Sequence, residues 1–201
     1  MTTKLSQNKS RNVLAALFSS SARVALLRIF LLDPNRAYYQ RQLESATGMA
    51  LRAVQRELER LVDIELLYRH QEGNRAYYSV DPSFPLLSDL RGIVMKAGNS
   101  FDRLRGELCG MGEVRLAFLN LSESTALVVA DQAITYTPEV VEEFKITTIS
   151  SEEFLGLVQK KSKRLIPFLE KGVDILGRRD DVIWRRIEAA GYSITKGEGI
   201  P

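Results

Sequence analysis

The pattern of apolar and polar positions predicts three helices in the first third of the chain. Apolar residues recur at helical spacing from Val24 to Leu32, after a serine run that can cap a helix and before a turn at residues 33–35. A short helix is expected over residues 40–46 and a longer one over residues 50–62, with Thr47-Gly48 as the turn between them. The apolar positions of the longer helix share one face, so its arginines lie mostly on the others.

After residue 64 the apolar period changes from helical to extended. Two strands are expected at residues 66–70 and 76–80, joined by a loop at residues 71–75 that carries Gly-Asn at its tip. A short extended piece at residues 37–39 precedes the second helix. The order of helix, short strand, helix, turn, helix and hairpin predicts a winged helix-turn-helix.

The second half predicts strands that alternate with helices, which is typical of a small α/β domain. The fold class is therefore α+β, with the winged helix-turn-helix over residues 1–97 and the α/β domain over residues 98–201. The Gly, Asn and Ser of residues 96–100 mark the expected boundary. Helices are expected at residues 88–95, 101–108, 151–170 with a kink at Pro167, and 178–190, a helical turn at 139–144, and strands at 114–119, 125–130, 145–149 and 173–177.

Charge is distributed unevenly along the 201 residues. Residues 1–97 hold 14 Lys+Arg and 9 Asp+Glu, a balance of +5, whereas residues 98–201 hold 14 and 16, a balance of −2. A basic first half favours contact with a polyanion, with chance variation in composition as the alternative.

Composition also excludes several classes of protein. One Cys and one His cannot build an internal disulfide or a Cys/His zinc site, so no metal or cofactor is expected. The chain has neither a secretory signal nor an apolar run of the roughly 18–20 residues that span a membrane, so we expect a cytoplasmic protein.

Two segments of the first half resemble a known family. They are "YYQRQLESATGMALRAVQRELERL" (residues 38–61) and "EGNRAYYSV" (residues 72–80), within a match that covers residues 19–80. They are similar to the DNA-binding domain of ArsR-like winged-helix transcriptional regulators, although Ala50 and Glu65 replace a usual capping Ser or Thr and a usual Gly. The resemblance implies a homodimer that binds double-stranded DNA. Helices at residues 84–95 and 101–108 are the candidates for the subunit contact, and an unknown small molecule or protein is a possible effector.

Seven side chains are candidates for DNA contact. Arg and Gln can form paired hydrogen bonds with guanine and adenine edges in the major groove, and Arg in a wing is favoured near phosphates or in the minor groove. The alternative is a solvated helix face on which the arginines pair with Glu57 and Glu59, and His70 is expected to be an exposed strand residue. The candidates are Arg52, Gln55 and Arg56 for base edges, Arg41 for a phosphate, and Arg69, Asn74 and Arg75 in the wing.

The second half resembles the small nucleotidyltransferase domain that follows some winged helices, in a degenerate form. "RLAFLNLSESTALVVAD" (residues 115–131) lies where that family carries a Gly-Ser phosphate loop and an Asp-x-Asp pair. Here residues 120–122 replace the loop motif, and Glu123 and Thr125 stand in place of the acids. The resemblance therefore implies a non-enzymatic assembly or sensing domain. The alternatives are a divergent nucleotidyltransferase or an antitoxin-like protein that uses the winged helix for target binding, and a winged helix that contacts proteins.

Overall fold

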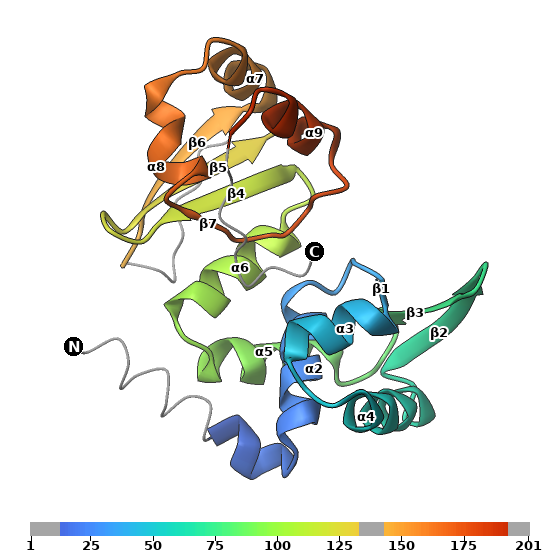
Figure 1. The fold of residues 1–201 in the computed structure, drawn as a ribbon. Coiled ribbons are helices and arrows are strands. Elements are labelled where there is room, and N and C mark those ends of the chain that lie inside the picture. Colours follow the sequence, from blue (N-terminus) through green and yellow to red (C-terminus); the bar gives the residue numbers. More distant parts are fainter. Residues whose placement is uncertain (1–12, 133–142, 193–201) are drawn as a thin grey trace. The chain divides into compact units, whose positions relative to one another are not determined.

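The structure is a computed structural model, and it describes residues 13–132 and 143–192 (Figure 1). It is α+β and contains two separate sheets within this part of the chain. The chain divides into two compact units, residues 1–110 and 111–201. The division falls after Gly110 instead of near Ala97, the boundary expected from the sequence.

The first unit combines helices with an antiparallel sheet of strand order β1-β3-β2. Its elements are a helical segment at residues 13–18, α2 (Ser21–Leu32), β1 (Tyr38–Tyr39), α3 (Gln40–Thr47), α4 (Leu51–Asp63), β2 (Leu67–Glu72), β3 (Arg75–Val80), α5 (Leu87–Ala97) and α6 (Ser100–Gly110).

Helix α2 forms the centre of the first unit because most of its side chains are apolar and buried. Leu26, Phe30 and Leu31 are fully buried, and the Ser20 side chain caps the helix by accepting a hydrogen bond from the Arg23 N–H. At its other end, the Phe30 ring packs edge-on against buried Tyr38, with ring centroids 5.5 Å apart. This contact fixes the end of α2 against the first strand.

The strands of the hairpin are longer than their sequence pattern predicts. Glu72 pairs with Arg75, so the connecting loop is only Gly73 and Asn74. Gly73 has φ +57°, a left-handed conformation that glycine adopts without a Cβ penalty. The Gly-Asn tip is therefore where it was expected, and the loop around it is shorter.

Helix α6 joins the first unit through a partly buried ion pair. Arg28 of α2 donates to both carboxylate oxygens of Asp102, and the Asn99 N–H donates to the same carboxylate. At Gly106 an added Cβ would approach Leu32 Cδ2 to 3.1 Å, so the two helices pack closely. These contacts with α2 explain why the first unit extends to Gly110.

The second unit contains a four-stranded sheet of order β6-β5-β4-β7, in which β5 and β6 are parallel and the other pairs antiparallel. The Phe118 ring of the sheet stacks with the rings of Phe154 and Trp184, at centroid distances of 6.2 and 6.1 Å. The elements are β4 (Val114–Asn120), β5 (Thr125–Ala130), β6 (Lys145–Ser150), α7 (Ser151–Gln159), η1 (Lys163–Leu165), α8 (Ile166–Leu169), β7 (Val173–Asp174) and α9 (Val182–Ala189).

The single helix expected over residues 151–170 is wrong. Helix α7 ends at Gln159, Lys161 adopts a left-handed φ of +48°, and the chain turns into η1 and α8. Pro167 lies in the first turn of α8, where its missing N–H costs little, and does not kink a longer helix.

The last strand and helix are also shorter than expected. Strand β7 ends at Asp174 because its carboxylate accepts the N–H groups of Leu176 and Gly177. Helix α9 begins at Val182, after Asp181 caps it by accepting the Ile183 N–H at 2.8 Å. The expected helical turn at 139–144 lies mainly outside the described residues. Within residues 13–132 and 143–192, no helix is long and apolar enough to cross a membrane.

We expect Asp102→Ala to destabilise the first unit by about 2–4 kcal/mol, because it leaves the half-buried Arg28 charge without its carboxylate. Urea unfolding measures the loss. Asp89→Ala, which removes an exposed acid from the first turn of α5, is the control and should change stability by less than about 0.5 kcal/mol. Equal losses in the two variants would contradict the structural role of the pair.

Candidate nucleic-acid interface

Helix α4 has one buried face and one polar face. Val54, Leu58 and Leu61 pack inward at helical spacing, while Arg52, Gln55 and Arg56 are exposed. The sequence prediction for the inward face is confirmed, and the three side chains proposed to meet base edges lie together on the outward surface. Ala50 precedes the helix without a side-chain cap.

The exposed arginines of α4 do not share one electrostatic environment. No described residue forms an ion pair with Arg52 or Arg56, whereas Arg60 donates to Glu57 Oε1 at 3.0 Å. Of these three arginines, only Arg60 is therefore paired with a glutamate of its own helix, as the alternative of a neutralised helix face requires. Arg52 and Arg56 keep their hydrogen-bond donors for solvent or a partner.

Glu57 does not lie on the exposed face of α4. The alternative of a solvated helix face treated it as an exposed partner of the arginines, but it is only 1% exposed. Its carboxylate accepts hydrogen bonds from Ser20 Oγ at 3.2 Å, Arg23 Nε at 2.9 Å and Arg60 Nη1 at 3.0 Å. The carboxylate thus connects the start of α2 to the middle of α4.

The environment of Glu57 changes its acidity in two opposing ways. Burial raises the pKa of the Glu57 carboxyl, while the hydrogen bonds from Arg23 and Ser20 and the positive charges of Arg23 and Arg60 lower it. The lowering dominates, so the pKa lies below its ordinary value and the group is ionised at neutral pH.

Helix α3 presents its first turn at the end of strand β1. The Tyr39 N–H donates to Gln42 Oε1 at 3.1 Å, which satisfies one of the free donors at the helix start. Arg41 lies in this turn and is exposed. This position fits a contact with a phosphate.

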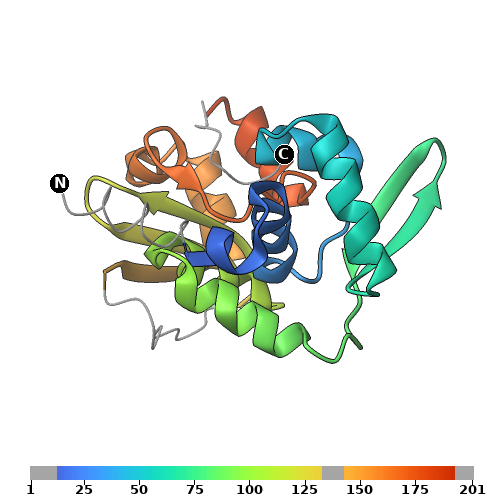
Figure 2. The same cartoon turned by 90° about the horizontal axis from the view of Figure 1, so that it is seen from below.

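The hairpin candidates are exposed, and one of them is held by an aromatic ring. Arg69, Asn74 and Arg75 all lie on the surface, and the Arg75 guanidinium sits 4.8 Å from the centroid of Tyr39. His70 is exposed on β2 and stacks on Tyr77 at 5.5 Å. Arg75 therefore lies near the start of α3, beside the element that carries Arg41, while the hairpin itself projects from the unit (Figures 1 and 2).

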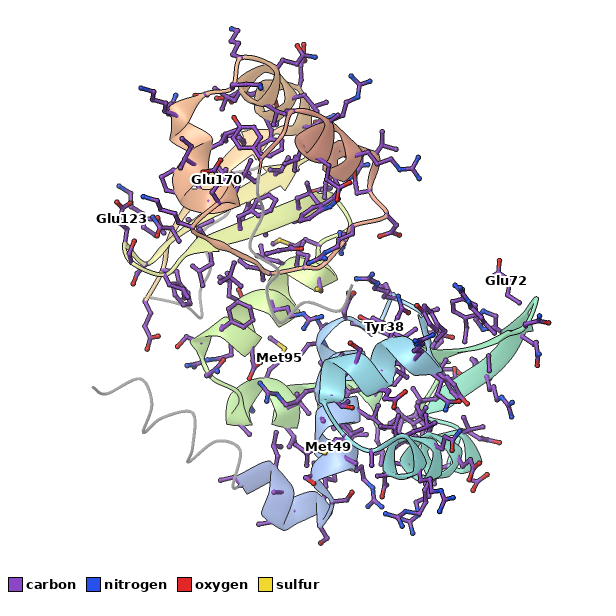
Figure 3. The ribbon with its side chains drawn as sticks, viewed as in Figure 1. Tyr38, Met49, Glu72, Met95, Glu123 and Glu170 are labelled. Carbon is purple, nitrogen blue, oxygen red and sulfur yellow. The ribbon has the colours of Figure 1, made fainter. Side chains whose placement is uncertain are left out.

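The segment that resembles the nucleotidyltransferase motif surrounds the turn between β4 and β5. Glu123 lies in the exposed turn between β4 and β5 (Figure 3), and Asn120 Oδ1 accepts the N–H and hydroxyl of Ser122 within that turn. Asp131 pairs with Arg115 at 2.9 Å. The part of the chain that the structure describes contains no group of three or more His, Cys, Asp or Glu side chains that could hold a metal ion.

Comparisons of the chain with family models, curated proteins and solved structures gave no match. Function is therefore inferred from the residues and their geometry.

We expect Glu57→Gln to lower the free energy of unfolding by about 1–3 kcal/mol at pH 7, because two arginines lose their charged acceptor. The pKa of Glu57 is lowered in the folded state, so its contribution is present above the unfolded value of about 4.5 and fades as the pH falls below it. The difference from the native chain should therefore shrink in acid, as urea unfolding at several pH values measures.

Glu59→Gln on the exposed face of the same helix is the matched control and should have little effect at any pH. A Glu57→Gln effect that stays constant down to pH 3 would contradict an ionised, hydrogen-bonded carboxylate.

Proposed function

We propose that the protein is a sequence-specific DNA-binding transcriptional regulator that acts as a homodimer, with the first unit as a winged helix-turn-helix. The observation that carries this proposal is the outward face of α4. There, Arg52 and Arg56 have no ion-pair partner among the described residues, and Gln55 lies exposed between them.

The chemistry of this face matches a major groove. An α-helix fits the groove, where Arg can donate two hydrogen bonds to guanine and Gln can pair with adenine. Arginines that are already neutralised inside the protein would lose part of that affinity, because a carboxylate neighbour competes for the same donors. Among the described residues, neither Arg52 nor Arg56 forms an ion pair with Glu57, and this supports a reading role for them.

Arg41, Arg69, Asn74 and Arg75 supply the remaining contacts in this proposal. Phosphate contacts set the register of a protein on the duplex, and side chains from separate elements hold it more firmly than one helix alone. Arg41 at the start of α3 is suited to one phosphate, and the hairpin residues to the backbone or a minor groove.

The dimer contact is proposed to lie on α5. Leu86, Leu90 and Ile93 fall on one side of this helix at intervals of four and three residues, and Leu86 and Ile93 are 55% and 39% exposed. Helix α6, the other sequence candidate, is less suitable because Leu104 and Leu108 are fully buried within the chain. A two-fold dimer presents two α4 helices to a palindromic site.

The second unit is proposed to be a non-enzymatic assembly or sensing domain. Phosphoryl chemistry of the nucleotidyltransferase kind needs carboxylates to hold Mg²⁺. In the β4–β5 turn, Glu123 is followed by Thr125 at the position where the second carboxylate would be needed. A single acid leaves the metal and the triphosphate charge inadequately coordinated.

The function is tested by selecting duplexes from random DNA with the full chain and then measuring affinities on selected and random sequences. We expect Arg52→Ala to cost about 1–3 kcal/mol on the selected site and less on random DNA, because it removes a base contact. Arg41→Ala should weaken binding to both alike, since it removes a phosphate contact. Arg185→Ala, an exposed arginine of α9, is the control.

Selection that returns no preferred sequence, or Arg52→Ala binding with unchanged affinity and specificity, would refute the reading role of α4.

The dimer is tested by Ile93→Glu, which places a charge in the apolar side of α5. We expect this variant to sediment as a monomer at micromolar concentration, because burying an unpaired carboxylate in the contact is costly. Ser88→Glu, on the exposed opposite side of the same helix, should remain a dimer. A native chain that is monomeric both with and without DNA would refute the proposal.

A further inference from the structure

A hollow of about 630 Å³ opens between the start of α2 and α4. This volume is in the range of small-molecule sites, roughly 300–1,000 Å³. We call it the α2–α4 hollow. Its apolar lining includes Phe18, Met49 and Ala53, and Met49 is labelled in Figure 3.

The charged lining of the α2–α4 hollow is net positive. Arg23, Arg56 and Arg60 contribute three guanidinium groups against the one carboxylate of Glu57, which leaves a balance of +2. The Glu57 carboxylate accepts hydrogen bonds from Arg23 Nε and Arg60 Nη1. Arg23 also donates from Nη1 to the Phe18 carbonyl. Each of the three guanidinium groups has further N–H donors beyond these bonds.

We propose that the α2–α4 hollow binds a small organic phosphate. A phosphate monoester carries nearly two negative charges near neutral pH and several strong acceptor oxygens, which match the charge and the donors of the hollow. A phosphate group is also present in the DNA backbone. The apolar side chains favour a free ligand that carries a compact apolar group beside its phosphate. A phosphodiester in a duplex has no such group.

Arg56 gives the site a regulatory consequence, which rests on the proposed function. Its side chain lines the hollow and also belongs to the exposed face of α4 that is proposed to read DNA. A phosphate bound in the hollow draws the Arg56 guanidinium away from base edges. The ligand and the preferred duplex therefore compete, and each weakens the other.

The test uses phenyl phosphate as the probe, titrated calorimetrically into the full chain without DNA at fixed ionic strength. Phenol, which lacks the charge, and inorganic phosphate, which lacks the apolar body, are the comparison ligands. We expect saturable binding of phenyl phosphate, weaker binding of inorganic phosphate and none of phenol.

Variants locate the binding. Arg60→Gln should weaken phenyl phosphate about tenfold by removing a charged donor from the hollow. Arg185→Gln, an exposed arginine of α9 outside the lining, is the control and should bind like the native chain. Because Arg60 also supports Glu57, Ala53→Leu is the second variant: it narrows the hollow without changing charge and should weaken binding.

The outcomes separate this proposal from the DNA-binding function. Saturable binding that Arg60→Gln and Ala53→Leu reduce supports the site even if no duplex is bound. Absent saturation, or equal binding by the native chain and all three variants, overturns it. If phenyl phosphate does not bind while Arg60→Gln and Ala53→Leu weaken every duplex alike, the phosphate comes from DNA and the small-molecule site is refuted.

Discussion

The first unit depends on one buried carboxylate. Apolar contacts between α2 and α4 exclude water, but they tolerate sliding because dispersion and hydrophobic burial have no direction. The Glu57 carboxylate is directional: three donors from the Ser20 cap, Arg23 and Arg60 meet it at 2.9 to 3.2 Å. Any shift of α4 along α2 would break the hydrogen bonds from Ser20 and Arg23 and leave the buried carboxylate with Arg60 alone, a donor of its own helix. The position of α4, the candidate reading helix, is therefore set by contacts inside the protein.

The same carboxylate divides the arginines of α4 into two groups. Arg60 is exposed but paired with Glu57, and Arg52 and Arg56 have no ion-pair partner among the described residues. Had Glu57 been exposed, it would have neutralised its neighbours on the outer face and reduced their value to an anionic partner. The burial of Glu57 thus has two effects. It fixes α4 against α2, and it keeps a carboxylate away from the outer face of α4.

The sequence predicted the elements of the first unit well, because each depends on signals a few residues long. Apolar periodicity located α2 and α4, and Gly73-Asn74 located the hairpin tip. It did not predict the burial of Glu57, which lies at the edge of the apolar face, where spacing alone cannot decide between solvent and core. It also missed the attachment of α6, since Arg28 and Asp102 are 74 positions apart in the chain.

Misassigned elements in the second unit have a similar origin. Lysine and arginine are good helix formers, so the run at residues 160–164 gave no sign of the left-handed Lys161 that ends α7. Strand β7 stops where the Asp174 side chain captures two backbone N–H groups, a choice that an apolar run cannot reveal. At Asp174, a specific polar contact overrides a local propensity worth less than about 1 kcal/mol per residue.

The sequence predicted the residue types of the candidate site better than it predicted their arrangement. Arg75 was expected on the wing, yet its guanidinium rests on the Tyr39 ring beside the start of α3. A cation–π contact of an exposed arginine contributes only about 0.5–1 kcal/mol, less than a charge-assisted bond to phosphate at about 1.5–3 kcal/mol. Arg75 can therefore exchange the ring for a phosphate with a net gain. In the absence of such a partner, Tyr39 restricts the Arg75 rotamers, so binding of the duplex in the proposed function would cost less side-chain entropy.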